Sequence, residues 1–200
     1  NLFGDWHGAQ SGLAKHGIVA DFDLTQFYQG VTSGGAEHRD AYGGKLDYNF
    51  TFLTQQMGLW KGGTLLMHAE TKFGENSNGD AGAFALPNLN LLYPLPGQND
   101  TAITGLLYLH QLNDRFSLVA GKINSVDFWS MFYPNVGRGL DGFMNLNSVA
   151  AGLPWLRFVQ LSENGAGILA MKEGQPQGAF VVFDPRNSST DVGLSNAFDQ

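Results

Sequence analysis

The sequence predicts an all-β protein: a transmembrane, antiparallel, up-and-down β-barrel preceded by a short N-terminal helix. Three observations predict it. Strand-length segments have one apolar and one polar face, the connections between them alternate in length, and the composition is rich in glycine and aromatic residues. The 200 residues include 27 Gly and 15 Phe but only 14% charged residues, a balance that favours β-rich folds over helical bundles.

The stretch 42–53 carries the clearest two-faced pattern. Because side chains alternate along a strand, one face presents Tyr, Leu and Phe side chains while the other presents Lys45, Asp47 and Asn49. A soluble sheet would turn the apolar face toward its core. A membrane barrel would turn that face toward lipid and the charges toward a wet lumen.

The same alternation and the turn residues define the other elements. Residues 5–16 predict a short helix that Asp5 could cap and Gly17 would end. The remaining strands are expected at 18–29, 64–73, 101–112 and 116–124, with weaker candidates at 167–172 and 179–184. We therefore expect an N-terminal segment over residues 1–17 and barrel strands with their loops over residues 18–200.

Connection lengths add a second signal. The long stretches 74–100 and 125–165 alternate with short ones such as Asn113–Arg115, and loops beyond about 15 residues are unusual inside compact domains. In an up-and-down sheet, alternate connections lie at the same end. One rim would then have short turns and the other long loops, as in transmembrane barrels.

Composition also excludes several functions. A net charge of -7, from 11 basic and 18 acidic residues, argues against nucleic acid as a partner. The chain has no Cys, and its five His residues lack zinc spacing. It also has neither a Gly-x-Ser-x-Gly elbow nor a His-Glu-x-x-His motif. We expect no enzyme activity, no catalytic residue, no metal and no cofactor.

Several short motifs, in this order and spacing, resemble the carbohydrate-selective porins of the OprB type. The opening Gly-Asp-Trp-x-Gly signature is followed by a short helix, Gly-Ile and the first strand. One position departs from the pattern, because Gln10 stands where that family usually has Arg. The motifs that carry the resemblance are Gly4–Gly8, Leu13–Ile18, Phe22–Leu24, Tyr42–Asp47, Trp60–Thr64 and Leu118–Asn124.

The resemblance implies a sixteen-stranded barrel in the outer membrane of a Gram-negative bacterium, in contact with lipid, through which sugars pass by facilitated diffusion. The resemblance also implies a homotrimer, the assembly that porins of this kind often form. One strand with its loops uses about 25 residues, so we expect the barrel to be incomplete in this chain and the residues to form the N-terminal half of a longer protein. The competing interpretation is a soluble β-sandwich that binds carbohydrate or a partner protein.

A sugar path needs polar side chains that bond hydroxyls and aromatic surfaces that stack on rings. Lumen-facing strand residues supply candidates, although they could also serve only to hydrate the wall. The aromatic segment 127–138 is the best candidate for a loop folded into the pore, although its aromatics could also pack only the loop itself. Trp60 and Trp155 could belong to an interfacial girdle or to a core. The pore-lining candidates are Asp21, Asp23, Lys45, Asp47, Asn49, His68, Glu70, Lys72, Trp129 and Arg138.

Overall fold

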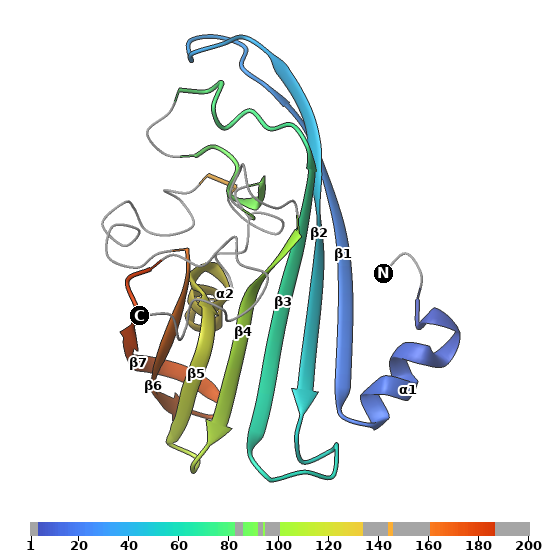
Figure 1. Cartoon of the computed structure of the whole chain (residues 1–200), viewed down its shortest axis with the longest axis vertical. Helices are drawn as coiled ribbons and strands as arrows, with labels where there is room; N and C mark the ends of the chain where they lie inside the picture. The colour runs from blue at the N-terminus through green and yellow to red at the C-terminus, as the bar shows by residue number, and fades with distance from the viewer. Residues whose placement is uncertain are drawn as a thin grey trace.

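The computed structural model describes residues 4–82, 86–91, 94, 101–133, 144–145 and 161–186. Seven strands form one antiparallel sheet in which each strand pairs with the next along the chain (Figure 1). This confirms the predicted up-and-down topology. The strands are β1 (Ile18–Gly30), β2 (Asp40–Leu53), β3 (Gly63–Gly74), β4 (Thr101–Gln111), β5 (Phe116–Asn124), β6 (Ser162–Lys172) and β7 (Gln175–Phe183).

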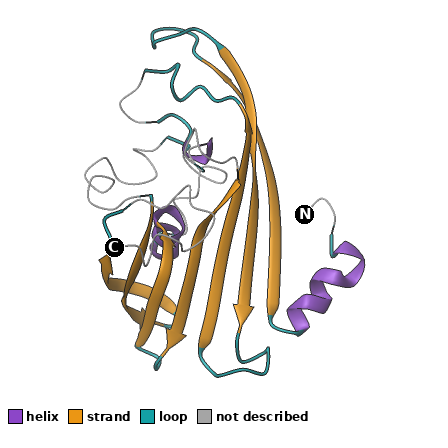
Figure 2. Cartoon of the chain, viewed as in Figure 1, coloured by secondary structure: helices purple, strands orange, loops and turns teal. Residues whose placement is uncertain are grey.

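The connections fall into two groups, one at each end of the sheet (Figure 2). One end carries the shorter connections, of which β4–β5 and β6–β7 are tight turns. In the β4–β5 turn, Asn113 Oδ1 accepts hydrogen bonds from the backbone N–H groups of Arg115 and Phe116, at 2.8 and 3.0 Å. In the β6–β7 turn, Glu173 and Gly174 adopt φ values of 52° and 77°, as two-residue hairpins require. The opposite end carries the long connections, so the predicted asymmetry is present.

The register places residues of one kind in rows across the sheet. Phe22 lies opposite Tyr48, and Asp23 lies opposite Asp47, which in turn faces Glu70 on β3. Residues directly opposite one another share a face of the sheet. The aromatic row and the acidic row therefore lie on opposite faces, and the acidic face is the concave one that α2 covers (Figure 1).

The N-terminal helix is present but broken. A 3-10 turn, η1 (Trp6–Gly8), meets α1 (Ala9–Lys15) through positive φ angles of 59° at His7 and 91° at Gly8. Asp5 makes no cap bond to the first turn; instead it accepts hydrogen bonds from the Ser11 hydroxyl at 2.6 Å and the Ser11 amide at 2.7 Å. These hydrogen bonds lower the pKa of Asp5. The prediction of one continuous capped helix was therefore wrong in detail.

This segment lies along the first strand. Trp6 stacks on Phe22 of β1, with ring centroids 5.0 Å apart. Gln10 Nε2 donates to the Ala20 carbonyl oxygen at 2.9 Å and to Asp21 Oδ1 at 3.3 Å. Gln10, at the position where the resembling family usually has Arg, thus still ties the helix to the sheet.

Among the described residues, two further helical segments lie inside the long connections. One is a 3-10 turn, η2 (Leu89–Leu91), and the other is α2 (Ser125–Phe132), which continues directly from β5. The sequence predicted only a loop at α2, and it predicted β6 and β7 to begin several residues later than they do. None of the helices among the described residues is long and apolar enough to span a bilayer.

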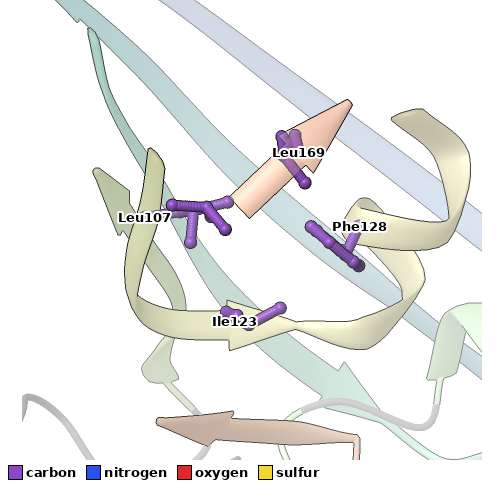
Figure 3. Packing of buried hydrophobic residues seen from close by; sticks show 5 residues of the cluster. Leu107, Ile123, Phe128 and Leu169 are labelled. Carbon is purple, nitrogen blue, oxygen red and sulfur yellow. The ribbon is translucent and has the colours of Figure 1, made fainter. Parts of the chain in front are cut away.

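The apolar core lies where α2 packs against the sheet. Its buried members are Leu107, Val119, Ile123, Phe128 and Leu169, from β4, β5, α2 and β6 (Figure 3). Half-buried Met131 and Phe132 of α2 extend the cluster. Burying side chains of this size stabilises a fold by about 1.5–3 kcal/mol each, so α2 is an integral part of the sheet's interior.

Candidate functional site

The polar part of the concave face is an ion-pair network that joins two strands to α2. Lys45 Nζ on β2 contacts Asp47 Oδ1 at 2.9 Å and Glu70 Oε1 on β3 at 2.7 Å. His68 Nε2 donates to Asp47 Oδ1 at 2.9 Å, and His68 Nδ1 donates to Asp127 Oδ2 on α2 at 2.6 Å. The chain of contacts therefore runs from Glu70 through Lys45, Asp47 and His68 to Asp127.

The register explains why this network is needed. Asp23, Asp47 and Glu70 stand opposite one another on three neighbouring strands, and carboxylates placed directly opposite repel each other. Lys45 and His68 lie one row to either side on the same face and supply the opposing charge. Without them, two of these carboxylates would be buried next to like charges, which is costly.

Burial reverses the usual distribution of polar and apolar side chains. On the concave face, Lys45 is 7% exposed, His68 6% and Glu70 1%, whereas on the outer face Leu24 is 56% exposed and Phe180 71%. Soluble proteins almost never bury Lys or Glu unless they are paired, and they rarely expose contiguous apolar surface. The outer face is therefore suited to an apolar medium.

Two adjoining hollows lie beside the network. The larger has a volume of about 360 Å³ and is lined by Asp21, Asn49, Lys122, Asp127 and Phe128, among others. The smaller, about 50 Å³, lies between the network and η2. Glu70 Oε2 and Asn90 Nδ2 are buried there without a hydrogen-bond partner among the described residues. Such a lining suits water or a hydroxyl group, which can donate to the carboxylate and accept from the amide.

The first turn of α2 is held by its cap. Asn124 Oδ1 accepts hydrogen bonds from the backbone N–H groups of Val126 and Asp127 at 3.0 and 3.3 Å. Its Nδ2 donates to Thr104 Oγ1 on β4 at 3.1 Å. The same side chain therefore begins the helix and fastens it to the neighbouring strand.

The structure brings together most of the residues that the sequence singled out. Asp21 and Asp23 of β1 and Asn49 of β2 line the larger hollow, and Lys45, Asp47, His68 and Glu70 line the smaller one. Lys72, whose Nζ donates to the Pro94 carbonyl at 2.6 Å, holds a loop segment against β3. That these residues line a solute path stays a prediction.

The aromatic candidates have different surroundings. Trp129 lies on α2, where its ring packs against Tyr133 with centroids 4.3 Å apart. Phe128 and Phe132 also pair, at 5.3 Å, and both pack against the apolar cluster of the sheet. Trp60, 51% exposed, donates from Nε1 to Tyr108 Oη at 2.7 Å. Arg138 and Trp155 lie outside the described residues.

Sequence reasoning did not single out Asn90, Lys122 or Asn124, and it placed Asp127 only at the start of the candidate pore loop. A signal for two of them was present, since an Asn followed three residues later by an Asp is typical of a helix N-terminus. Lys122 and Asn90 carry no local signal, because their burial depends on the strand register and on the path of a long loop.

One trio in the network has ligand atoms close enough to hold a metal ion: those of Asp47, His68 and Glu70 lie within 4.8 Å of one another. The Lys45 ammonium already contacts both carboxylates. A positive charge thus occupies the place where a cation would bind, and the chemistry of the cluster is that of an ion-pair network.

Comparison with known proteins agrees with this geometry. The chain is similar to a solved structure described as the high pH structure of Pseudomonas putida OprB, with a TM-score of 0.70 and 16% identity. The match covers 98% of this chain and 47% of that one, so the chain spans about half its length. No protein-family model and no curated protein matches the chain. The predicted resemblance is confirmed for the fold: the chain has the fold of part of an OprB-type porin barrel.

Proposed function

We propose that this chain forms part of an outer-membrane porin barrel through which small solutes, sugars among them, diffuse in a water-filled lumen. The reversed burial carries the proposal: charged side chains lie under α2 and η2 on the concave face, while apolar side chains are exposed on the outer face. A soluble sandwich would need the opposite arrangement.

The height of the apolar face supports a membrane position. Exposed Tyr28 and Tyr42 pair near one end of the outer face, and Tyr108, in the row of Phe52, lies with Trp60 near the other. Tyr42 and Phe52 stand ten positions apart on β2, which corresponds to about 34 Å along a strand. A tilt of about 40° reduces this to about 26 Å, close to the height of about 25 Å of the apolar band in such barrels, which aromatic girdles border.

The chemistry of the concave face suits diffusion of neutral solutes. Carboxylates, ammonium groups and neutral amides attract water into a lumen and form hydrogen bonds with hydroxyl groups. Because both charge signs are present, the lumen has no strong preference for anions or cations. Passage needs no covalent step, only binding weak enough to release the solute. The end strands β1 and β7 of this sheet would pair with further strands of the complete barrel, because hydrocarbon does not tolerate an open edge.

Detergent extraction and liposome swelling test the proposal. The full-length protein, exported to the outer membrane of a bacterial host, should require detergent for extraction and migrate differently on gels before and after heating. Reconstituted into liposomes, it should allow swelling in monosaccharides and less swelling in larger oligosaccharides. A monodisperse protein in detergent-free buffer, or liposomes that do not swell, would contradict the proposal. Light scattering of the solubilised protein would test the homotrimer, which stays a prediction.

A further inference from the structure

We infer that His68 and Asp127 act as positioning residues, which hold the first turn of α2 against the wall and so fix how far this helix reaches into the lumen. The inference rests on the proposed function, because the bore matters only if solutes pass. It concerns one contact, that between His68 Nδ1 and Asp127 Oδ2 at 2.6 Å.

The geometry makes this contact directional. His68 uses both ring nitrogens, one toward Asp127 on α2 and one toward Asp47 on β2. Ionised carboxylates only accept hydrogen bonds, so both nitrogens carry protons in this arrangement. A ring held from both sides cannot rotate without losing one bond. Since His68 lies on β3 and Asp47 on β2, these two hydrogen bonds connect α2 to two strands of the wall.

His68, Asn124 and Asp127 meet over Gly105 of β4. A Cβ added to Gly105 would lie 3.3 Å from Asn124 Cβ, 3.5 Å from His68 Cβ and 3.8 Å from Asp127 Oδ2. The three side chains therefore lie close together above this glycine, where β3 and the start of α2 face each other across β4. Asn124, the residue before α2, fixes the start of the helix on β4 through its hydrogen bond to Thr104.

A change in the position of this contact would alter the shape of both hollows. His68 and Asp127 line both hollows, so the pair forms part of the boundary between them. The neighbouring residue Phe128, on the apolar side of α2, is held separately by its packing against the sheet. Loss of the ion pair should therefore let the side of α2 that carries Asp127 shift while the apolar side stays packed, which changes the free cross-section at this level.

A competing explanation is that Asp127 contributes only its charge. The chain offers a matched control, because Asp23 lines the same hollows from β1 and has the same charge. A second control is Asp127→Asn, since the amide oxygen can still accept from His68 while the charge is gone. Asp127→Ala removes both the charge and the hydrogen bond.

Liposome swelling of the full-length protein separates these explanations. The measured quantity is the ratio of the swelling rate in a trisaccharide to that in a monosaccharide, for variants whose heat-dependent gel shift shows a folded barrel. We expect Asp127→Ala and His68→Ala each to change this ratio about two-fold or more, and the double variant to change it no further, because the two residues act through one contact. Asp127→Asn should change the ratio no more than Asp23→Asn does, because each removes one charge from the same hollows and the amide oxygen of the Asp127→Asn variant can still accept from His68.

Other outcomes overturn the inference. If Asp127→Asn shifts the ratio as far as Asp127→Ala does, charge rather than position is responsible. An unchanged ratio in Asp127→Ala, or additive effects in the double variant, would show that the contact does not position α2. A wild-type protein that passes no sugar would contradict the proposed function and this inference together. Wild-type passage with unaltered variants would contradict the inference alone.

Discussion

The two sides of α2 are held by opposite kinds of interaction. On the polar side, Asp127 forms an ion pair with His68 of β3, whereas on the apolar side Phe128 packs into a cluster from β4, β5 and β6. Apolar packing is non-directional and scales with buried area, while a buried ion pair contributes little net free energy but specifies geometry. The difference indicates that the apolar side supplies the stability of this segment and the polar side sets its position.

The largest effect on stability should come from the apolar side. Phe128→Ala removes a ring that is 7% exposed, and we expect it to lower the free energy of unfolding by about 4 kcal/mol. Urea unfolding in detergent, followed by tryptophan fluorescence, would measure the loss. The matched control is Tyr133→Ala, one turn further and 50% exposed, for which we expect about 1 kcal/mol or less. Equal losses in the two variants would contradict the assignment of the apolar core.

A somewhat smaller effect should follow from breaking the network on the polar side. Lys45→Met leaves Asp47 and Glu70 buried without their ammonium partner, and we expect a loss of about 3 kcal/mol in the same unfolding measurement. Adding Glu70→Gln removes one of the uncompensated charges and should recover part of that loss. A double variant less stable than Lys45→Met alone would show that the carboxylate of Glu70 is stabilised by something other than Lys45.

The sequence predicts which residues share a face of a strand, because this depends only on period-two alternation. The alternation placed Lys45, Asp47 and Asn49 on the face opposite Leu46 and Tyr48, and the register confirms it. What alternation cannot give is the contact between a strand and a distant helix. Asp127 meets His68 across 59 residues. The helix α2 is short, and its position depends on the sheet against which it packs.

The two faces of one strand allow a third test. Leu46→Arg would place a charge on the outer face near the middle of the apolar band, whereas Asn49→Arg would place it in the larger hollow near Asp21. We expect the first to lower the free energy of unfolding by about 2–3 kcal/mol and the second by about 1 kcal/mol or less. Refolding into lipid vesicles at graded urea concentrations would measure both. Similar losses at the two positions would contradict the assignment of the outer face to lipid.

The smallest loss of stability should come from substitutions of Asn124, the residue that caps α2 and binds it to β4. Asn124 begins α2 through its side-chain oxygen and holds Thr104 through its amide. Asn124→Ala loses both and should cost about 1 kcal/mol, a typical value for an N-cap. Asn124→Ser keeps a capping oxygen but cannot reach across to β4 in the same way, so its loss in the urea measurement should be smaller. If the two variants lose equal stability, the bond to Thr104 outweighs the cap. The start of α2 would then be determined by the neighbouring strand rather than by its own first turn.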